Sequence, residues 1–183
     1  MGKVIYLDRL RGWKVDMDEK VKNLLKEYNL YSVPVDPIEL ARYLDVDVYW
    51  SDFKDRNLSG VISKDNEKVV ILISDSEPYN RTRFTVAHEL GHLELHMNSN
   101  KVFEEYHRGD VSGNAEERKV EIEANSFAAS LLMPTEFVRR EFKKLSGSNY
   151  SNEEKTSILA DIFKVSESAM MFRLMNLGLI SCS

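Results

Sequence analysis

The chain has 183 residues, of which 43% are hydrophobic and 30% are charged, and its formal net charge at pH 7 is −5. These totals are ordinary for a globular protein of one domain, and the acidic balance argues against general affinity for nucleic acid. The only cysteine is Cys182, so a disulfide framework is excluded, which suits a reducing compartment. No apolar run reaches membrane-spanning length and the N-terminus lacks a signal-peptide core, so we expect a cytoplasmic protein with no membrane partner.

The N-terminal third predicts two helices and a strand. Residues 18–30 carry their apolar side chains on one helical face, which indicates an amphipathic helix. Residues 35–46 predict a second helix, because Asp36 is a good N-cap and Pro37 suits the first helical position. The segment VDVYW, which follows, predicts a short strand.

Two further strands are expected as a hairpin. The segments LSGVIS (58–63) and KVVILIS (68–74) are rich in β-branched residues and are joined by KDNE, a typical turn composition. The second segment is an almost continuous apolar run, which is typical of a strand covered on both faces.

The remaining sequence predicts helices and one long loop. A helix is expected over residues 81–97, and another over residues 115–133, where Pro134 ends it. Residues 98–114 contain two glycines and mixed charges and are expected to form the loop between them. The segment TEFVRREFKKL (135–145) predicts a further helix, which a linker follows.

The segment HELGH within the helix at 81–97 has the pattern of a metal site. Residues four apart on a helix lie about 40° apart around its axis, so His88 and His92 can reach one ion. Glu89 lies on the flank of the same arc, where it can act as a general base rather than a ligand. His96 is separated from His88 by roughly 12 Å of helical rise, so it cannot join them and is expected to cap or pack.

The third ligand is expected on the helix at 115–133. On a helical wheel, Glu121 lies at the centre of the buried face among alanines, where a carboxylate needs a cation. Asn125, one turn later, can hydrogen-bond a ligand histidine and hold its tautomer. Glu117 remains an alternative ligand, and Glu121 could instead pair with Arg81 or Arg83. The polar side of the wheel, expected to face solvent, contains Glu116, Lys119, Glu123, Ser126 and Ser130.

These motifs resemble one known family. The segments RTRFTVAHELGHLELH and EIEANSFAASLLMP are similar to those of the ImmA/IrrE zinc metallopeptidases, with likeness over roughly residues 30–140. The resemblance implies an α+β fold, a small gluzincin-like unit in which a short β-sheet lies beside the active-site helices. Carried over by position, the zinc ligands correspond to His88, His92 and Glu121. Glu89 corresponds to the catalytic base and Asn125 to the residue that holds a ligand histidine.

The resemblance further implies a zinc-dependent endopeptidase with a specific protein substrate, often a helix-turn-helix repressor of a phage or mobile element. By residue type alone, Tyr106, His107 and Tyr79 are candidate donors to the oxyanion. The edge near KVVILIS could bind an extended peptide by strand addition. A zinc-containing module that sequesters a transcription factor without cutting it is the alternative, although a structural zinc site has no need of Glu89.

The C-terminal segment is expected to be a separate element. We assign residues 1–150 to the metallopeptidase domain and residues 151–183 to a helix-turn-helix-like element packed on it. A DNA reader needs cations on its second helix, which offers mainly Arg173 and Asn176 within a segment of net charge about −1. We therefore do not expect direct DNA binding, although a DNA binder with a vestigial protease fold remains a third possibility.

Overall fold

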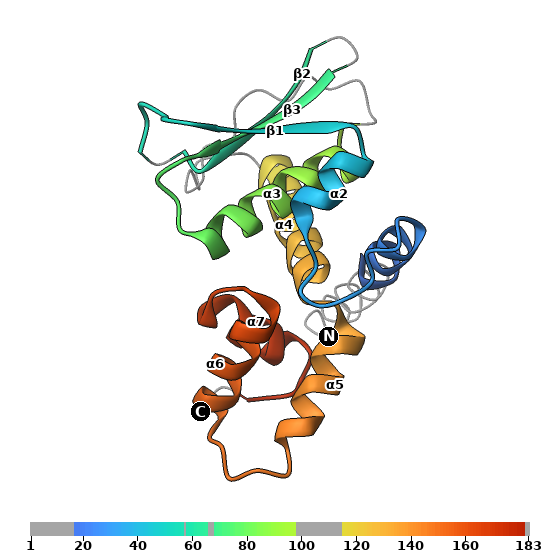
Figure 1. The fold of residues 1–183 in the computed structure, drawn as a ribbon, viewed down its shortest axis with the longest axis vertical. Coiled ribbons are helices and arrows are strands. Elements are labelled where there is room, and N and C mark those ends of the chain that lie inside the picture. The colour runs from blue at the N-terminus through green and yellow to red at the C-terminus, as the bar shows by residue number, and fades with distance from the viewer. Residues whose placement is uncertain (1–16, 57, 66–67, 98–114, 182–183) are drawn as a thin grey trace.

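The computed structural model describes residues 17–56, 58–65, 68–97 and 115–181. Within this part, a small sheet forms one layer, helices lie beneath it, and a group of C-terminal helices forms the opposite end (Figure 1). The fold is therefore of the α+β class, as predicted.

The N-terminal part begins with a helix at residues 17–27 and continues into α2, Pro37–Tyr43. The Asp36 side chain accepts hydrogen bonds from the backbone N–H groups of Ile38 and Glu39, which otherwise lack partners in the first turn. The predicted N-cap is thus confirmed, and α2 leads directly into the first strand.

The sheet consists of β1 (Val46–Ser51), β2 (Gly60–Asp65) and β3 (Lys68–Ser74) in the order β1-β3-β2. The hairpin is confirmed, because β2 and β3 pair antiparallel, whereas β1 pairs with β3 in parallel. The chain therefore places its last strand in the middle of the sheet.

The expectation that this strand is covered on both faces is wrong. Ile71 and Ile73 are fully buried, but Val70 and Leu72, which alternate with them, are only partly buried. Successive side chains of a strand point to opposite faces. Among the described residues, helices cover one face of the sheet (Figure 1), so they enclose only the side chains that point to that face.

Two long helices carry the motifs: α3 (Tyr79–Leu95) and α4 (Ala115–Leu132). The first begins and ends two residues earlier than predicted. Every residue of α3 from Thr85 to His92 is buried, because the sheet lies over it and α4 packs along it (Figure 1).

The C-terminal helices are α5 (Thr135–Leu145), α6 (Asn152–Phe163) and α7 (Glu167–Asn176). Ser151 and Glu154 form the capping box that starts α6, and Ser166 caps α7. The turn between these two helices contacts α3, since Arg83 donates to the Lys164 carbonyl at 3.1 Å. No helix in the described ranges combines the length and apolarity needed to cross a bilayer.

Candidate metal centre

Close packing of α3 against α4 builds the candidate site. A Cβ atom placed on Gly91 would lie 3.1 Å from both the Cα and the carbonyl oxygen of Ala124, and 3.2 Å from the Cβ of Phe127. Those distances are tighter than ordinary van der Waals contact, so the absence of a side chain at Gly91 sets the separation of the helices. This separation brings Glu121 of α4 to the histidines of α3.

Three side chains converge at this point. Nε2 of His88 and Nε2 of His92 lie 3.0 Å apart, Oε2 of Glu121 lies 3.4 Å from Nε2 of His88, and Oε1 of Glu121 lies 3.2 Å from Nε2 of His92. Within the described residues, these three make up the group of ligand-type side chains that could hold a metal ion. Both imidazoles are buried, whereas the Glu121 side chain is 31% exposed, so the group opens on one side.

The triangle fits a tetrahedral zinc ion. Bonds of about 2.0–2.1 Å in tetrahedral geometry separate neighbouring ligand atoms by about 3.3 Å, close to the three observed edges. Oε1 of Glu121 is buried without a hydrogen-bond partner, a costly state that a cation would relieve. The donor set of two imidazoles and one carboxylate is that of catalytic zinc sites, which keep a fourth position open.

Asn125 holds one imidazole in the orientation a metal needs. Its Oδ1 lies 3.1 Å from Nδ1 of His88, so Nδ1 carries the proton and donates it. The lone pair of His88 is then on Nε2, the nitrogen that faces His92 and Glu121. The neighbouring Phe84 ring stacks on His88 with its centroid 6.5 Å away, which closes another side of the imidazole.

The carboxylate of Glu121 is held in its charged form. Burial raises the pKa of Glu121, but its close contacts with the imidazoles of His88 and His92 outweigh burial and keep that pKa well below its usual range. An ionised carboxylate is the form that ligates a metal.

Glu89 follows His88 on α3, and its carboxylate lies close to the sheet. It is 93% buried, and its Oε1 lies 3.6 Å from the position a Cβ on Gly60 would occupy, at the start of β2. The same Cβ would lie 2.3 Å from Cγ2 of Thr85, so β2 approaches α3 this closely only because residue 60 is glycine. Glu89 is thus next to His88 in sequence and close in space to the start of an outer strand.

The alternatives raised for Glu121 do not occur. Glu117 is exposed and does not belong to the group of three. Arg81 pairs with Glu77 at 3.1 Å, while Arg83 donates to backbone carbonyls, including that of Val35 at 2.6 Å. Neither arginine is therefore the partner of Glu121.

Other predicted residues take different places. His96 is the C-cap residue of α3, and its Nε2 lies 3.8 Å from Glu123, so it packs rather than joining the group. Tyr79 is 66% exposed and precedes His88 by nine residues, which is about 13 Å of rise and about half a turn out of phase. That position does not favour Tyr79 as an oxyanion donor. Tyr106 and His107 lie outside the described residues.

The helical wheel of α4 is wrong on its polar side and in part on the side predicted to be buried, where Asn125 is exposed and Glu121 is only partly buried. Ser130 is buried and donates to Asp18 at 2.6 Å, and the Glu123 side chain is only 19% exposed beside His96. Ile122, by contrast, is 59% exposed. The wheel assumes that α4 packs against a single helix. In the structure, the helix at 17–27 also covers part of the α4 face that was predicted to face solvent.

The sequence reasoning also missed an ion pair. Arg173, expected on the exposed face of α7, is 92% buried and contacts Asp18 at 2.7 Å. It also donates to the Met133 carbonyl at 3.0 Å and to the Thr135 hydroxyl at 3.0 Å. Its partners lie 38 residues or more away in sequence, so no local pattern could have revealed them.

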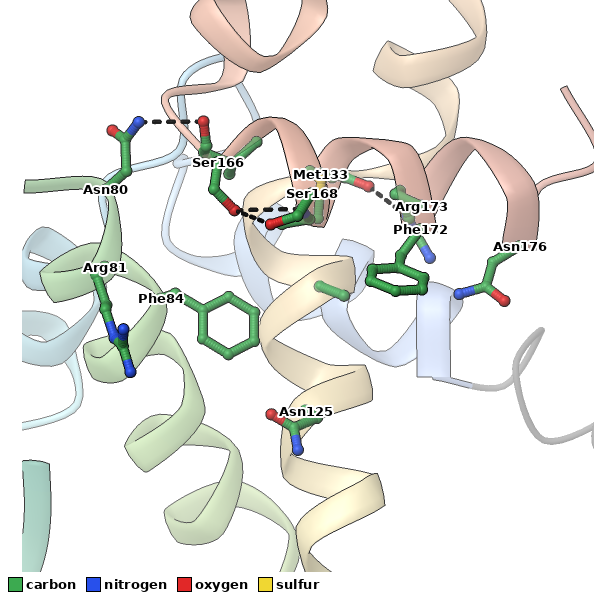
Figure 2. Close-up of a pocket in the computed structure, with 13 residues that line it drawn as sticks. Asn80, Arg81, Phe84, Asn125, Met133, Ser166, Ser168, Phe172, Arg173 and Asn176 are labelled. Carbon is green, nitrogen blue, oxygen red and sulfur yellow. Dashed lines mark hydrogen bonds between the residues drawn. The ribbon is translucent and has the colours of Figure 1, made fainter. Parts of the chain in front are cut away.

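A cavity of about 640 Å³ borders the metal centre (Figure 2). It lies between α3, α4 and α7, and Asn125 and Phe84 belong to its wall. Sequence reasoning did not find it, because it forms between three elements whose relative placement depends on long-range packing.

Comparison with known proteins agrees with the fold and identifies a family. Residues 41–175 match the model of a peptidase family, described as the IrrE N-terminal-like domain. The chain belongs to this family, which is metal-dependent, and the His88–His92–Glu121 group could hold the ion.

Two individual proteins are similar to the chain. One, "Uncharacterized immunity region protein 2" of Bacillus phage phi105, is 32% identical over 115 residues, which cover 62% of this chain and 66% of the phage protein. The other is a solved structure, "Mycobacterium tuberculosis transcriptional regulator", with a TM-score of 0.60 and 19% identity over 87% of this chain. The match spans 46% of that solved chain, and at 19% identity the likeness concerns the fold alone.

Proposed function

We propose that the chain is a zinc-dependent endopeptidase that acts in the cytoplasm on one specific protein, a helix-turn-helix repressor of a phage or mobile element. The observation that carries this proposal is the triangle of His88, His92 and Glu121, whose edges suit zinc and which has Glu89 beside it on the same helix. A structural metal site has no need of a buried carboxylate in that position.

In this mechanism, His88, His92 and Glu121 hold the ion and Asn125 keeps the His88 ring oriented. A zinc ion bound there would supply Lewis-acid chemistry for the hydrolysis of a peptide bond. Glu89 would accept a proton from the attacking water and deliver it to the leaving amine. Burial of Glu89 and of both imidazoles keeps solvent from weakening the electrostatic interactions of the site.

An extended substrate would lie along β2 rather than along the strand suggested by the sequence. The edge of β3 is not available, since β1 and β2 occupy both of its sides. Of the two outer strands, β2 begins at Gly60, next to Glu89. Backbone pairing with β2 would therefore direct a peptide towards the base.

The name of the phage relative supports a repressor as the substrate class. That protein is called an immunity region protein, and phage immunity is a matter of transcriptional control. Direct DNA binding by this chain is not supported, because the main cation of α7, Arg173, is buried against Asp18.

The test compares the zinc-loaded chain with Glu89→Gln, using a purified helix-turn-helix repressor from the neighbouring genes. We expect new termini by mass spectrometry with the wild type, and a loss of rate of about a thousandfold with Glu89→Gln at unchanged zinc content. The matched control is Glu117→Gln, which changes an exposed glutamate on α4. This variant should cleave the repressor at the wild-type rate.

The outcomes separate the candidate functions. A repressor that binds the chain and keeps its intact mass would indicate sequestration and refute the peptidase. Full activity of Glu89→Gln would refute the role of Glu89. A salt-dependent shift of DNA in the absence of any repressor would instead favour a DNA reader.

A further inference from the structure

We propose that the cavity between α3, α4 and α7 is a specificity pocket that receives an uncharged apolar side chain of the protein substrate, close to the bond that is cut. The inference rests on the proposed peptidase function and adds to it the chemistry of the substrate. It assigns to the helix-turn-helix-like element a role as one wall of the substrate site.

The cavity has room for a side chain of the substrate together with the backbone beside it. Its volume of about 640 Å³ lies within the usual range for ligand sites. Phe84 of α3, Ala129 of α4 and Phe172 of α7 supply apolar surface from three directions, and Figure 2 shows both aromatic rings directed into the space between the helices. Such a lining favours apolar groups.

The pocket is continuous with the metal centre. Asn125 belongs to its wall and is also the residue that accepts from Nδ1 of His88, at 3.1 Å. Phe84 belongs to the wall and stacks on the same imidazole. If the peptide bond to be cut lies next to the three ligand side chains, a neighbouring side chain of the substrate is close enough to enter the pocket.

Phe172 is an apolar side chain without full cover. It is 66% exposed, although the adjacent α7 residues Arg173 and Leu174 are buried. Covering an aromatic ring of this kind is favourable, and aromatic residues of this kind dominate binding energy at interfaces. Phe172 is thus suited to close over an inserted side chain.

The wall is held in place before any substrate arrives. Arg173, next to Phe172, is bound to Asp18, to the Met133 carbonyl and to the Thr135 hydroxyl. On the other flank, Asn80 donates to the Val165 carbonyl at 3.1 Å. These contacts fix α7 against the rest of the protein, so substrate binding costs little conformational entropy in this wall.

The charges around the cavity favour an uncharged guest. Two arginines contribute to its lining, but Arg81 is paired with Glu77 at 3.1 Å and Arg173 with Asp18 at 2.7 Å. Each cation already has its counter-ion, so an acidic side chain would gain little on entering and would lose its hydration.

The test uses random dodecapeptides displayed on phage and selected on the full zinc-loaded chain carrying Glu89→Gln, which allows binding without cleavage. Two further variants alter the pocket from its exposed rim: Phe172→Ala removes an aromatic ring from one wall, and Ser168→Trp narrows the space. The matched control is Met171→Ala, because Met171 is 40% exposed on the same helix and does not line the cavity. Zinc content and melting temperature are measured for all variants.

We expect the selected peptides to share an apolar residue at one position. Phe172→Ala should weaken their binding about tenfold, and Ser168→Trp should weaken it at least as much, with zinc content and melting temperature unchanged. Met171→Ala should bind like the parent. Equal binding by all variants, selection without an apolar preference, or no selection at all would overturn the pocket.

The same peptides separate this inference from the proposed function. They are incubated with the zinc-loaded chain that retains Glu89, and their termini are analysed. Peptides that bind through Phe172 but stay intact would leave the pocket standing and refute the peptidase. If Phe172→Ala instead cuts the peptides with the same preference as the parent, the peptidase stands and the pocket is refuted.

Discussion

Gly91 lies between the two histidines of HELGH, and its lack of a side chain decides how closely α4 approaches. The atoms nearest to an added Cβ are backbone atoms of Ala124, which cannot rotate away as the end of a flexible side chain could. Room for a methyl group has to come from a shift of α4. Because Glu121 lies less than one turn before Ala124, it would move with the helix.

We therefore expect Gly91→Ala to weaken zinc binding about tenfold, since a displacement of a few tenths of an ångström lengthens two edges of the ligand triangle. The affinity is measured by competition with a chromophoric chelator. Gly147→Ala is the control, because a Cβ there meets no atom within 4 Å. Unchanged affinity in Gly91→Ala would mean that the helix spacing does not depend on this glycine.

Individual residues differ in how far the sequence determines them. The pairing of His88 with His92 follows from the geometry of one helix, so the spacing alone predicted it. The position of Glu121 depends on the register between two helices. The wheel of α4 predicted only that Glu121 is on the side facing the protein, and it did not predict that register. Ser130 was misplaced because its partner, Asp18, comes from a helix that a wheel of α4 does not include.

Among the elements, the ion pair of Asp18 with Arg173 joins the helix at 17–27 to α7. Asp18 also accepts from the hydroxyls of Ser130 and Thr135, each at 2.6 Å. Burial raises the pKa of Asp18, but the charge and hydrogen bond of Arg173 and the two hydroxyl donors outweigh it, so the pKa is lowered from its usual 3.8.

A lowered pKa in the folded state means that the ionised form stabilises the fold. This stabilisation is fully present above the unfolded value of 3.8 and is lost as the pH falls through the lower, folded value. We expect Asp18→Asn to lower the free energy of unfolding by about 2 kcal/mol at neutral pH, and the difference from the wild type to shrink in acid. Urea unfolding of both proteins over this pH range gives the measurement.

The control for this experiment is Asp161→Asn, an exposed carboxylate on α6, which should change stability by less than about 0.5 kcal/mol. A difference between Asp18→Asn and wild type that stays constant into acid would show that the carboxylate charge is not what stabilises the contact.

Element types were predictable, and element partners were not. Capping residues such as Asp36 and Ser151 located helix starts, because a cap is a contact within three residues. The parallel pairing of β1 with β3 joins segments about twenty residues apart, with β2 between them in sequence. No residue in β1 specifies that neighbour, so the order of the sheet had to come from the structure.

For the whole molecule, zinc should act as a stabilising ligand, because its three ligands come from two separate helices. At a free concentration of one hundred times the dissociation constant, binding adds about 2.7 kcal/mol, which corresponds to a rise in melting temperature of about 5–10 °C. Differential scanning fluorimetry with zinc, and then with excess chelator, measures the rise and its reversal.

Glu121→Ala should lose most of this rise, and Glu117→Ala, one turn earlier on α4, should keep it. The opposite result would identify Glu117 as the ligand. An equal rise in both variants would mean that zinc stabilises the protein at some other place.

Asp18 and Arg173 are 155 residues apart in sequence, and their contact closes almost the entire described chain into a loop. Contacts of such long range are costly in chain entropy and form late, after local helices and the hairpin have assembled. This order of folding has a consequence for function. The two histidines can be paired on one helix early, whereas the cavity beside them is complete only after α7 has docked. A newly folding molecule would thus acquire the means to bind a metal before it acquires the wall that selects what is cut.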